Sequence, residues 1–404
     1  MLSSIVNPNT LQTLNSFRVH AGVKIMEEFD DNIFNSANDG IADKIFHVMP
    51  SIGVDSDWGR HSFGASFKVD KGYYEKNSTQ DFYDYIIDSK ARIDIQDQSS
   101  LGLGYAHTRQ HIIGNAPITA PSAFDPSNPF GQVVDNSAST TTVYHQDIFA
   151  LQPVFSTDPL IARVNIDGQR WTYATNNNVD LGYQNFWEYA ITPRIGYQAW
   201  EDTSLYVEPQ YSQRIYDADH DLNGFNQNSR EYQVLFGLTY DFADISYLDV
   251  GIGVVHSTFT DPAFTPTTGP TFDISGIWNA TELLTFNARL LQSNLATTDF
   301  ETKQVATNSF SLGADWEMRN NLYFNLTGSY IDAVYQSASQ TQTTTSTSTE
   351  DRHDRTFTYS AGLTYYFLDY LTANASYLFT DRKSNLEADK LTKRQWFVSI
   401  AAKI

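Results

Sequence analysis

Apolar side chains recur at every second position in long runs along this 404-residue chain. In the stretch TYSAGLTYYFLDYLTANASYLFTDRKSN (358–385), two such runs lie on either side of a short break at 368–370. The residues between the apolar ones are small or polar. A period of two is the pattern of a β-strand whose two faces meet different surroundings. The chain is therefore expected to consist of long strands.

The composition agrees with strands that have one apolar face and one polar face. The chain has 24 Tyr and 26 Phe, yet only 41% of its residues are hydrophobic, which suits a sheet with one wet face. It has no cysteine, so disulfides and thiolate metal sites are excluded. Its net charge of −21 argues against a nucleic-acid partner, since phosphate binding needs a basic surface. No apolar run approaches the ~18 residues of a membrane helix.

The connections between the runs alternate in length. The alternating pattern predicts about 18 strands. Tight turns are expected at 57–60, 97–100, 156–159, 200–203, 243–246, 279–282, 318–321 and 368–370. Long polar loops are expected at 28–43, 111–140, 217–228, 259–269, 294–304, 336–354 and 382–391. Short turns at one end and long loops at the other are typical of bacterial outer-membrane barrels, whose strands of ~10 residues cross the bilayer at a tilt.

These observations predict an all-β fold, a transmembrane antiparallel β-barrel. In lipid every backbone N–H and C=O must be paired, so the sheet must close on itself. Residues 15–404 are expected to form this single barrel, after an N-terminal periplasmic segment at 1–14. An even number of strands places both termini in the periplasm, with short periplasmic turns and long extracellular loops. The expected surroundings are the outer-membrane lipid bilayer and lipopolysaccharide.

Assigning the polar phase of each strand to the interior predicts a wet lumen with charges of both signs. The simpler interpretation is that these groups solvate the lumen and pair with one another. The functional one is that they line a path for a polar solute, because hydroxyls of sugars need hydrogen bonds. The predicted transport-path residues are Arg18, Lys24, Asp88, Arg92, Glu188, Arg194, Glu208, Arg214, Arg289 and Asn325.

Two loops carry additional predictions. The Pro-, Asn- and Ser-rich loop at 111–140 is long enough to fold inward as a constriction that carries Phe124 and Phe130; the alternative is a surface loop. In DADHDLNG, the alternating Asp217, Asp219 and Asp221 resemble the oxygen ligands of a calcium loop. The EF-hand spacing is incomplete, so a solvated acidic loop is the alternative to bound Ca²⁺. No other cofactor is expected.

No constellation of residues indicates catalysis. Histidines such as His20, His107 and His256 are scattered, with no serine or carboxylate at the spacing of a nucleophile and its base. The chain is therefore not expected to be an enzyme.

Several stretches resemble a family of outer-membrane β-barrel proteins associated with exopolysaccharide synthesis loci. They are FRVHAGVKIMEEFDDNIF (17–34), VMPSIGVDSDWGRHSFGASFKVDKGYYEKNSTQDFYDY (48–85), TPRIGYQAWEDTSLYVEPQYSQRIYD (192–217) and LTYYFLDYLTANASYLFTDRKSN (363–385). The resemblance implies passage of a secreted polysaccharide across the outer membrane, with a periplasmic polysaccharide-export protein as partner. It supplies no set of functional residues. The chain ends in Ile404, whereas such barrels usually end in Phe or Trp.

Three functions follow as hypotheses. The first is an outer-membrane conduit for exopolysaccharide. The second is a passive diffusion porin for small polar solutes. The third is a closed, surface-exposed binding or structural barrel. A porin should be permanently open, a conduit should be gated or plugged at rest, and a closed barrel should conduct nothing.

Overall fold

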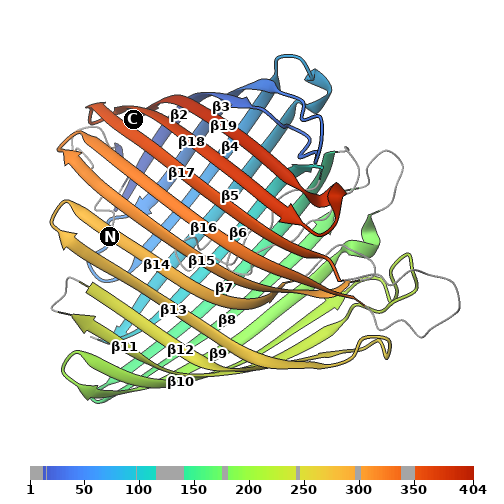
Figure 1. Cartoon of the computed structure of the whole chain (residues 1–404). Coiled ribbons are helices and arrows are strands. Elements are labelled where there is room, and N and C mark those ends of the chain that lie inside the picture. Colours follow the sequence, from blue (N-terminus) through green and yellow to red (C-terminus); the bar gives the residue numbers. More distant parts are fainter. Residues whose placement is uncertain are drawn as a thin grey trace, which may run out of the picture.

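The computed structural model describes residues 12–14, 16–96, 98–114, 141–174, 181–242, 246–295, 302–337 and 351–404. Within these residues, one antiparallel sheet closes into an 18-strand barrel, to which a short strand, β1 (Gln12–Leu14), adds an extra pairing (Figure 1). No helix in this part of the chain is long and apolar enough to cross a membrane. The predicted fold is confirmed.

Each barrel strand pairs with its neighbours in sequence, and the last pairs with the first. The ring closes where β19 meets β2, with Ile400 opposite Ile25. The first nine strands are β2 (Phe17–Asp30), β3 (Asp43–Ser56), β4 (Ser62–Tyr74), β5 (Phe82–Gln96), β6 (Ser99–Ile113), β7 (Thr141–Thr157), β8 (Leu160–Tyr173), β9 (Phe186–Trp200) and β10 (Thr203–Tyr216). The others are β11 (Ser229–Phe242), β12 (Ser246–Phe259), β13 (Thr267–Thr281), β14 (Leu284–Leu295), β15 (Thr302–Arg319), β16 (Leu322–Ser337), β17 (His353–Leu368), β18 (Leu371–Ser384) and β19 (Leu391–Lys403).

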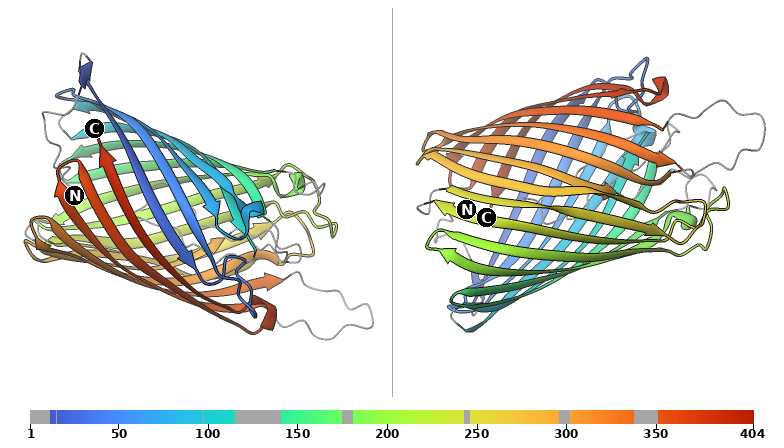
Figure 2. Two further views of the ribbon diagram at one scale, coloured as in Figure 1. Left: turned by 90° about the horizontal axis from the view of Figure 1, so that it is seen from above. Right: turned by 60° about the horizontal axis from the view of Figure 1, so that its bottom comes forward.

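The two ends of the barrel differ as the sequence predicts. At one end, here the tight-turn end, consecutive strands are separated by two to five residues, as at 158–159 and 320–321. The long connections gather at the opposite end, here the long-loop end (Figures 1 and 2). Short 3-10 helices at Ser78–Gln80, Gly182–Gln184 and Glu387–Asp389 interrupt three of these connections. The β1 strand and these helices have no counterpart in the sequence prediction.

The outer face of the barrel is apolar, and the alternation of side chains explains it. On β19 the exposed residues are Trp396, Val398 and Ile400, whose side chains lie 56–62% exposed. Exposed aliphatic and aromatic side chains of this kind recur on strands all round the barrel. Such a band is unfavourable in water and stable in lipid, which matches the outer surface of a transmembrane barrel.

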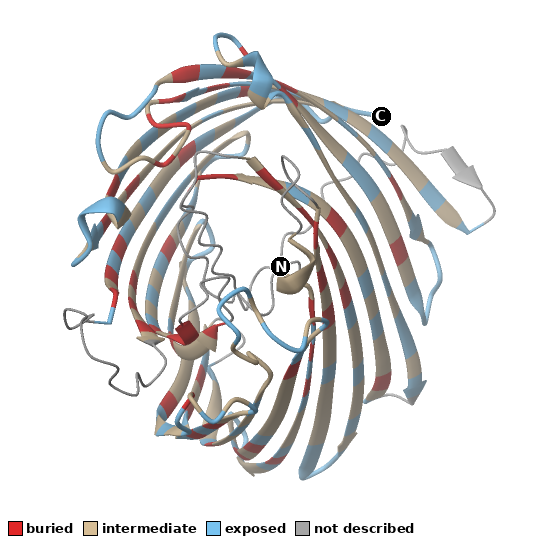
Figure 3. Ribbon diagram, turned by 90° about the vertical axis from the view of Figure 1, so that its right-hand side faces the viewer, coloured by how far each residue is buried: buried red, intermediate tan, exposed pale blue. Residues whose placement is uncertain are grey.

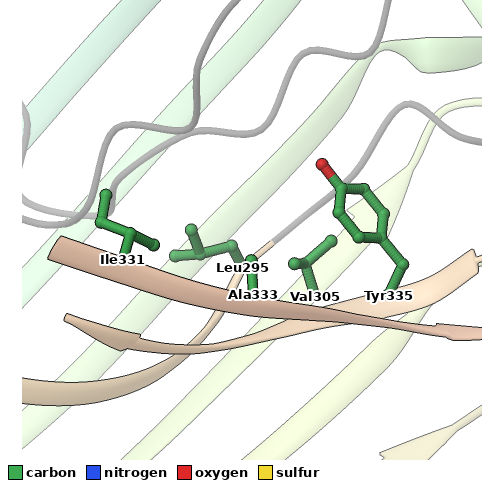
Figure 4. Close-up of a cluster of buried hydrophobic side chains, with 5 residues drawn as sticks. All are labelled: Leu295, Val305, Ile331, Ala333 and Tyr335. Carbon is green, nitrogen blue, oxygen red and sulfur yellow. The ribbon is translucent and has the colours of Figure 1, made fainter. Parts of the chain in front are cut away.

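Two departures from simple alternation lie toward the long-loop end. On β14–β16 the interior phase becomes apolar, and Leu295, Val305, Ile331, Ala333 and Tyr335 form a buried cluster (Figure 4). Viewed from this end, buried residues mark many of the strands of the ring (Figure 3). The rule that apolar residues face only lipid is therefore too simple here.

On β6 and β7 the outer phase carries polar groups. Asp147 accepts hydrogen bonds from Tyr105 Oη (2.8 Å) and lies 2.8 Å from His107 Nδ1. Hydrogen bonding within the cluster lowers the cost of placing these groups on the outer face.

Candidate functional site in the polar lumen

The concave face of the barrel is identified by contacts that reach across several strands. Arg194 on β9 donates from Nη1 to Asp249 Oδ2 on β12 at 2.5 Å. Three strand spacings of ~4.8 Å separate these positions along the wall. Side chains converge across that distance only on the inside of a curved sheet. The phase that contains Arg194 therefore faces the lumen.

Arg194 is the centre of the largest ion-pair network in the described lumen. Its Nε donates to Glu208, and its guanidinium lies 3.8 Å from the centre of the Tyr206 ring. Asp249 also accepts from Tyr206 Oη (2.7 Å), Tyr247 Oη (3.1 Å) and Thr239 Oγ1 (3.1 Å). Each charge thus has an opposite charge, and Asp249 has three further hydrogen bonds, as a charge in a partly dry wall requires.

A glycine makes room for this network. Gly237 on β11 pairs with Tyr206, and a Cβ at Gly237 would lie 2.4 Å from the Tyr206 ring and 2.2 Å from the Val250 carbonyl oxygen. No other residue type fits there without moving its neighbours. The small residue in the strand therefore positions the tyrosine that holds Asp249.

Two further pairs continue the charged surface. Arg214 donates from Nη2 to Glu188 Oε1 at 2.6 Å, and Arg289 makes two bonds of 2.9–3.0 Å to Asp273. We name the lumen-phase charged residues of β8–β14 the ion-pair wall. Its members are Arg163, Asp167, Glu188, Arg194, Glu208, Arg214, Glu231, Asp241, Asp249, Asp273 and Arg289.

The middle of β15–β18 differs from the ion-pair wall, because most of its lumen-phase side chains are short, polar and uncharged; Asp315, opposite Asn325, is a carboxylate at its border. Thr327 and Ser360 share a hydrogen bond of 3.1 Å, and Asn374 Nδ2 donates to Thr364 Oγ1 at 2.9 Å. We name this surface the hydroxyl wall. Its members are Ser309, Ser311, Asn325, Thr327, Ser329, Thr358, Ser360, Thr364, Asn374 and Ser376.

The predicted transport-path residues fall into two groups. The structure brings together Glu188 with Arg214 and Arg194 with Glu208, and it places Arg289 on the same wall. The other five lie elsewhere. Asp88 accepts a hydrogen bond from Ser66 Oγ (2.5 Å), Arg92 donates one to Asp94 (2.7 Å), and Arg18 forms an ion pair with Asp57. Lys24 lies opposite Met49 on the neighbouring strand. Asn325 occupies the space that a Cβ on Gly362 would fill. Their role in transport stays a prediction.

Sequence reasoning missed the acceptor that links three strands, Asp249, and the buried amides Gln146 and Gln169. Asp249 directly precedes an apolar and glycine run at 250–255, and this isolated carboxylate was the available signal. The amides lie 2.9 Å apart, Nε2 to Oε1, and both are at most 5% exposed. Their pairing depends on the register of β7 against β8, which the local sequence does not reveal.

The predicted calcium residues do not converge in the described loop. Asp217 binds Arg170 through two bonds of 2.5–2.7 Å, while Asp221 accepts from the backbone N–H of Asn223 and of Phe225, both at 2.9 Å. The described residues contain no group of three or more His, Asp or Glu side chains that could hold a metal ion. Bound Ca²⁺ at Asp217, Asp219 and Asp221 remains a prediction. Phe124 and Phe130, the predicted constriction, lie outside the described residues.

Solved outer-membrane proteins share this architecture. The siderophore receptor PiuA from Acinetobacter baumannii is similar over 98% of this chain and 82% of its own, at 10% identity and a TM-score of 0.50. OccK3 (OpdO) from Pseudomonas aeruginosa matches over 96% and 95%, at 13% identity and a TM-score of 0.44. The chain spans 62% of the FrpB iron transporter of Neisseria meningitidis (F3-3 variant), which covers 90% of this chain at 12% identity and a TM-score of 0.46.

At such identities these likenesses concern the fold alone. No curated protein matches the chain. The profile of one protein family matches residues 12–404, which is nearly the whole chain. That match and the barrel's apolar outer face place the chain in the bacterial outer membrane as a porin-like barrel. The chain belongs to the family described as "Putative beta-barrel porin 2".

Proposed function

We propose that this barrel passes a secreted exopolysaccharide across the outer membrane. The observation that carries the proposal is the hydroxyl wall, a sector in the middle of the barrel most of whose lumen-phase side chains are uncharged hydroxyls and amides. Such groups exchange hydrogen bonds with sugar hydroxyls and with water at similar free energy. A polymer can then move from site to site without being held at any one, which conduction requires.

The ion-pair wall supports the same proposal. Its arginines are paired with carboxylates on other strands of the wall, so these cations are already neutralised and do not hold a polymer in place. In this proposal the termini and tight turns lie in the periplasm, where an export protein delivers the polymer. The long loops then face outward, beside lipopolysaccharide. The family resemblance in the sequence points to the same class of cargo.

A second candidate is a passive diffusion porin for small polar solutes. It is favoured by the mixture of both charge signs in the lumen, which selects neither anions nor cations strongly. A closed surface barrel is the third alternative.

Single-channel conductance in a planar bilayer separates the three. The purified full chain is compared with a variant that lacks residues 115–138, which belong to the loop at 111–140 that is predicted to constrict the pore. A silent intact protein that opens after the deletion supports the gated conduit. A large steady conductance in the intact protein supports the diffusion porin. Silence in both variants supports the closed barrel, and continued polymer release from cells that lack the protein would refute export.

A further inference from the structure

A recess of about 200 Å³ opens in the ion-pair wall between β9 and β15. It forms because the β13–β14 ladder ends at the pair Asp273–Leu291, which leaves residues 292–295 of β14 without partners on β13. Asn294, which has no partner on β13, donates a hydrogen bond from Nδ2 to Glu231 Oε2 on β11 at 2.8 Å. The recess is smaller than the ~300–1,000 Å³ sites of drug-sized ligands, so it suits a single ring.

One side of the recess presents a fixed donor. Arg214 is 8% exposed, and its Nε is buried without a hydrogen-bond partner in the described structure. Its guanidinium is held by Glu188, whose Oε2 accepts from Gln169 Nε2 at 2.6 Å. Gln169 in turn accepts from Gln146 and from Trp171 Nε1 at 2.7 Å. This relay across β7–β10 fixes the guanidinium before a ligand arrives. The Nε atom is buried, so a ligand oxygen reaches it only after a small shift of the lining side chains, and the missing hydrogen bond favours that shift.

The other side presents acceptors and uncharged polar groups. Both hydrogen bonds to Glu231, from Asn294 and from Ser257 Oγ (2.9 Å), go to Oε2, so Oε1 can accept from a ligand hydroxyl. Gln210 and Ser212 also line the recess, and Leu235 and Leu291 add apolar surface. Donors, acceptors and a small apolar area around a ring-sized space match the surface of a sugar unit.

The charges define which sugars fit. Glu188, Glu208 and Asp273 each have an arginine partner, whereas Glu231 is bound only by the neutral Ser257 and Asn294. The lining holds four carboxylates, Glu188, Glu208, Glu231 and Asp273, and three arginines, Arg214, Arg230 and Arg289. The carboxylates therefore exceed the arginines by one, and an anionic ligand would be repelled. We propose that the recess binds one neutral pyranose unit of a glycan; its place in export rests on the function proposed above, but the binding itself does not.

Saturation-transfer NMR on the detergent-solubilised full chain tests this binding directly. The probes are the neutral tetramer of N-acetylglucosamine and the anionic tetramer of galacturonic acid. The neutral probe should bind and the anionic probe should not. Arg214→Lys keeps a cation beside Glu188 but removes the Nε donor, and should weaken neutral binding about threefold to tenfold. Arg394→Lys, at an ion pair with Asp31 outside the recess, should leave binding unchanged.

Glu231→Gln keeps the size of the side chain and removes its charge. It should keep the neutral probe and admit the anionic one, a gain that a merely structural role of Glu231 would not produce. The Glu231→Gln variant also tests the proposal if the Arg214→Lys variant fails to fold. Equal binding of both probes to the unaltered chain, or no response to either substitution, would overturn the proposal. A recess that binds the neutral probe in a barrel that exports no polymer would instead refute only the export function.

Discussion

The ion-pair wall and the hydroxyl wall face the same lumen with opposite chemistry. On β8–β14, side chains reach two or three strands away and fix one another, as Arg194 does with Asp249. On β15–β18, hydrogen bonds such as Thr327–Ser360 join only neighbouring strands, and the groups are short and neutral. Both walls are polar, but only the first is rigidly cross-linked. The comparison suggests that the ion-pair wall fixes the shape of the pore, while the hydroxyl wall is the surface along which the proposed polymer moves.

Removing the centre of the ion-pair wall should have the largest effect. Arg194→Met leaves Glu208 and Asp249 without their shared cation, and breaking such a pair costs about 3 kcal/mol or more where it is buried. The free energy of unfolding, measured by denaturant titration in lipid vesicles, should fall accordingly. The matched change on the other wall, Thr358→Val, should lower it by less than about 1 kcal/mol. Equal losses would mean that the walls do not differ in rigidity.

Overpacking the ion-pair wall should rank second. Gly237→Ala forces a Cβ against the Tyr206 ring and the Val250 carbonyl, and such strain costs about 1–3 kcal/mol. Gly328→Ala on β16 meets no atom within 4 Å, so its unfolding free energy should not fall. The same vesicle titration checks both variants. A stable Gly237→Ala would show that Tyr206 is free to move and does not hold Asp249 in place.

Charging the hydroxyl wall should alter selectivity more than stability. Ser360→Asp puts one carboxylate into the neutral sector, and a unit charge at 4 Å in water is worth about 1 kcal/mol, or about fivefold in ion preference. The reversal potential under a salt gradient should shift toward cation selectivity in a conducting form of the barrel. Ser360→Asn is the neutral control. An unchanged reversal potential would place the path of the ions away from this wall.

The smallest effect is expected at the tight turn after β3. The hydrogen bond from Arg18 lowers the pKa of Asp57, so any stability from this pair is present above the ordinary carboxyl pKa and is lost as pH falls through the lowered value. Both side chains are about half exposed, where ion pairs contribute little. Asp57→Asn should therefore leave the thermal unfolding temperature unchanged at pH 7. A clear decrease would show that the turn anchors β2.

The sequence by itself determined the barrel, its approximate strand number and the phase of most strands. Those features depend on local alternation: Trp396, Val398 and Ile400 face outward because a strand reverses its side chains at each residue. The segregation of short turns from long loops is likewise visible in the chain. The prediction of an apolar outer face and a polar lumen fails most clearly toward the long-loop end, where the cluster around Tyr335 is buried and apolar.

Only the tertiary structure decided which lumen residues act together. Arg194 and Asp249 are 55 residues apart and lie on strands that do not pair, so their contact depends on curvature and on the register of four strands. The recess depends on the point where the β13–β14 ladder stops, which no local pattern marks. Alternation is a property of each strand alone, whereas ion pairs and recesses are properties of the closed wall.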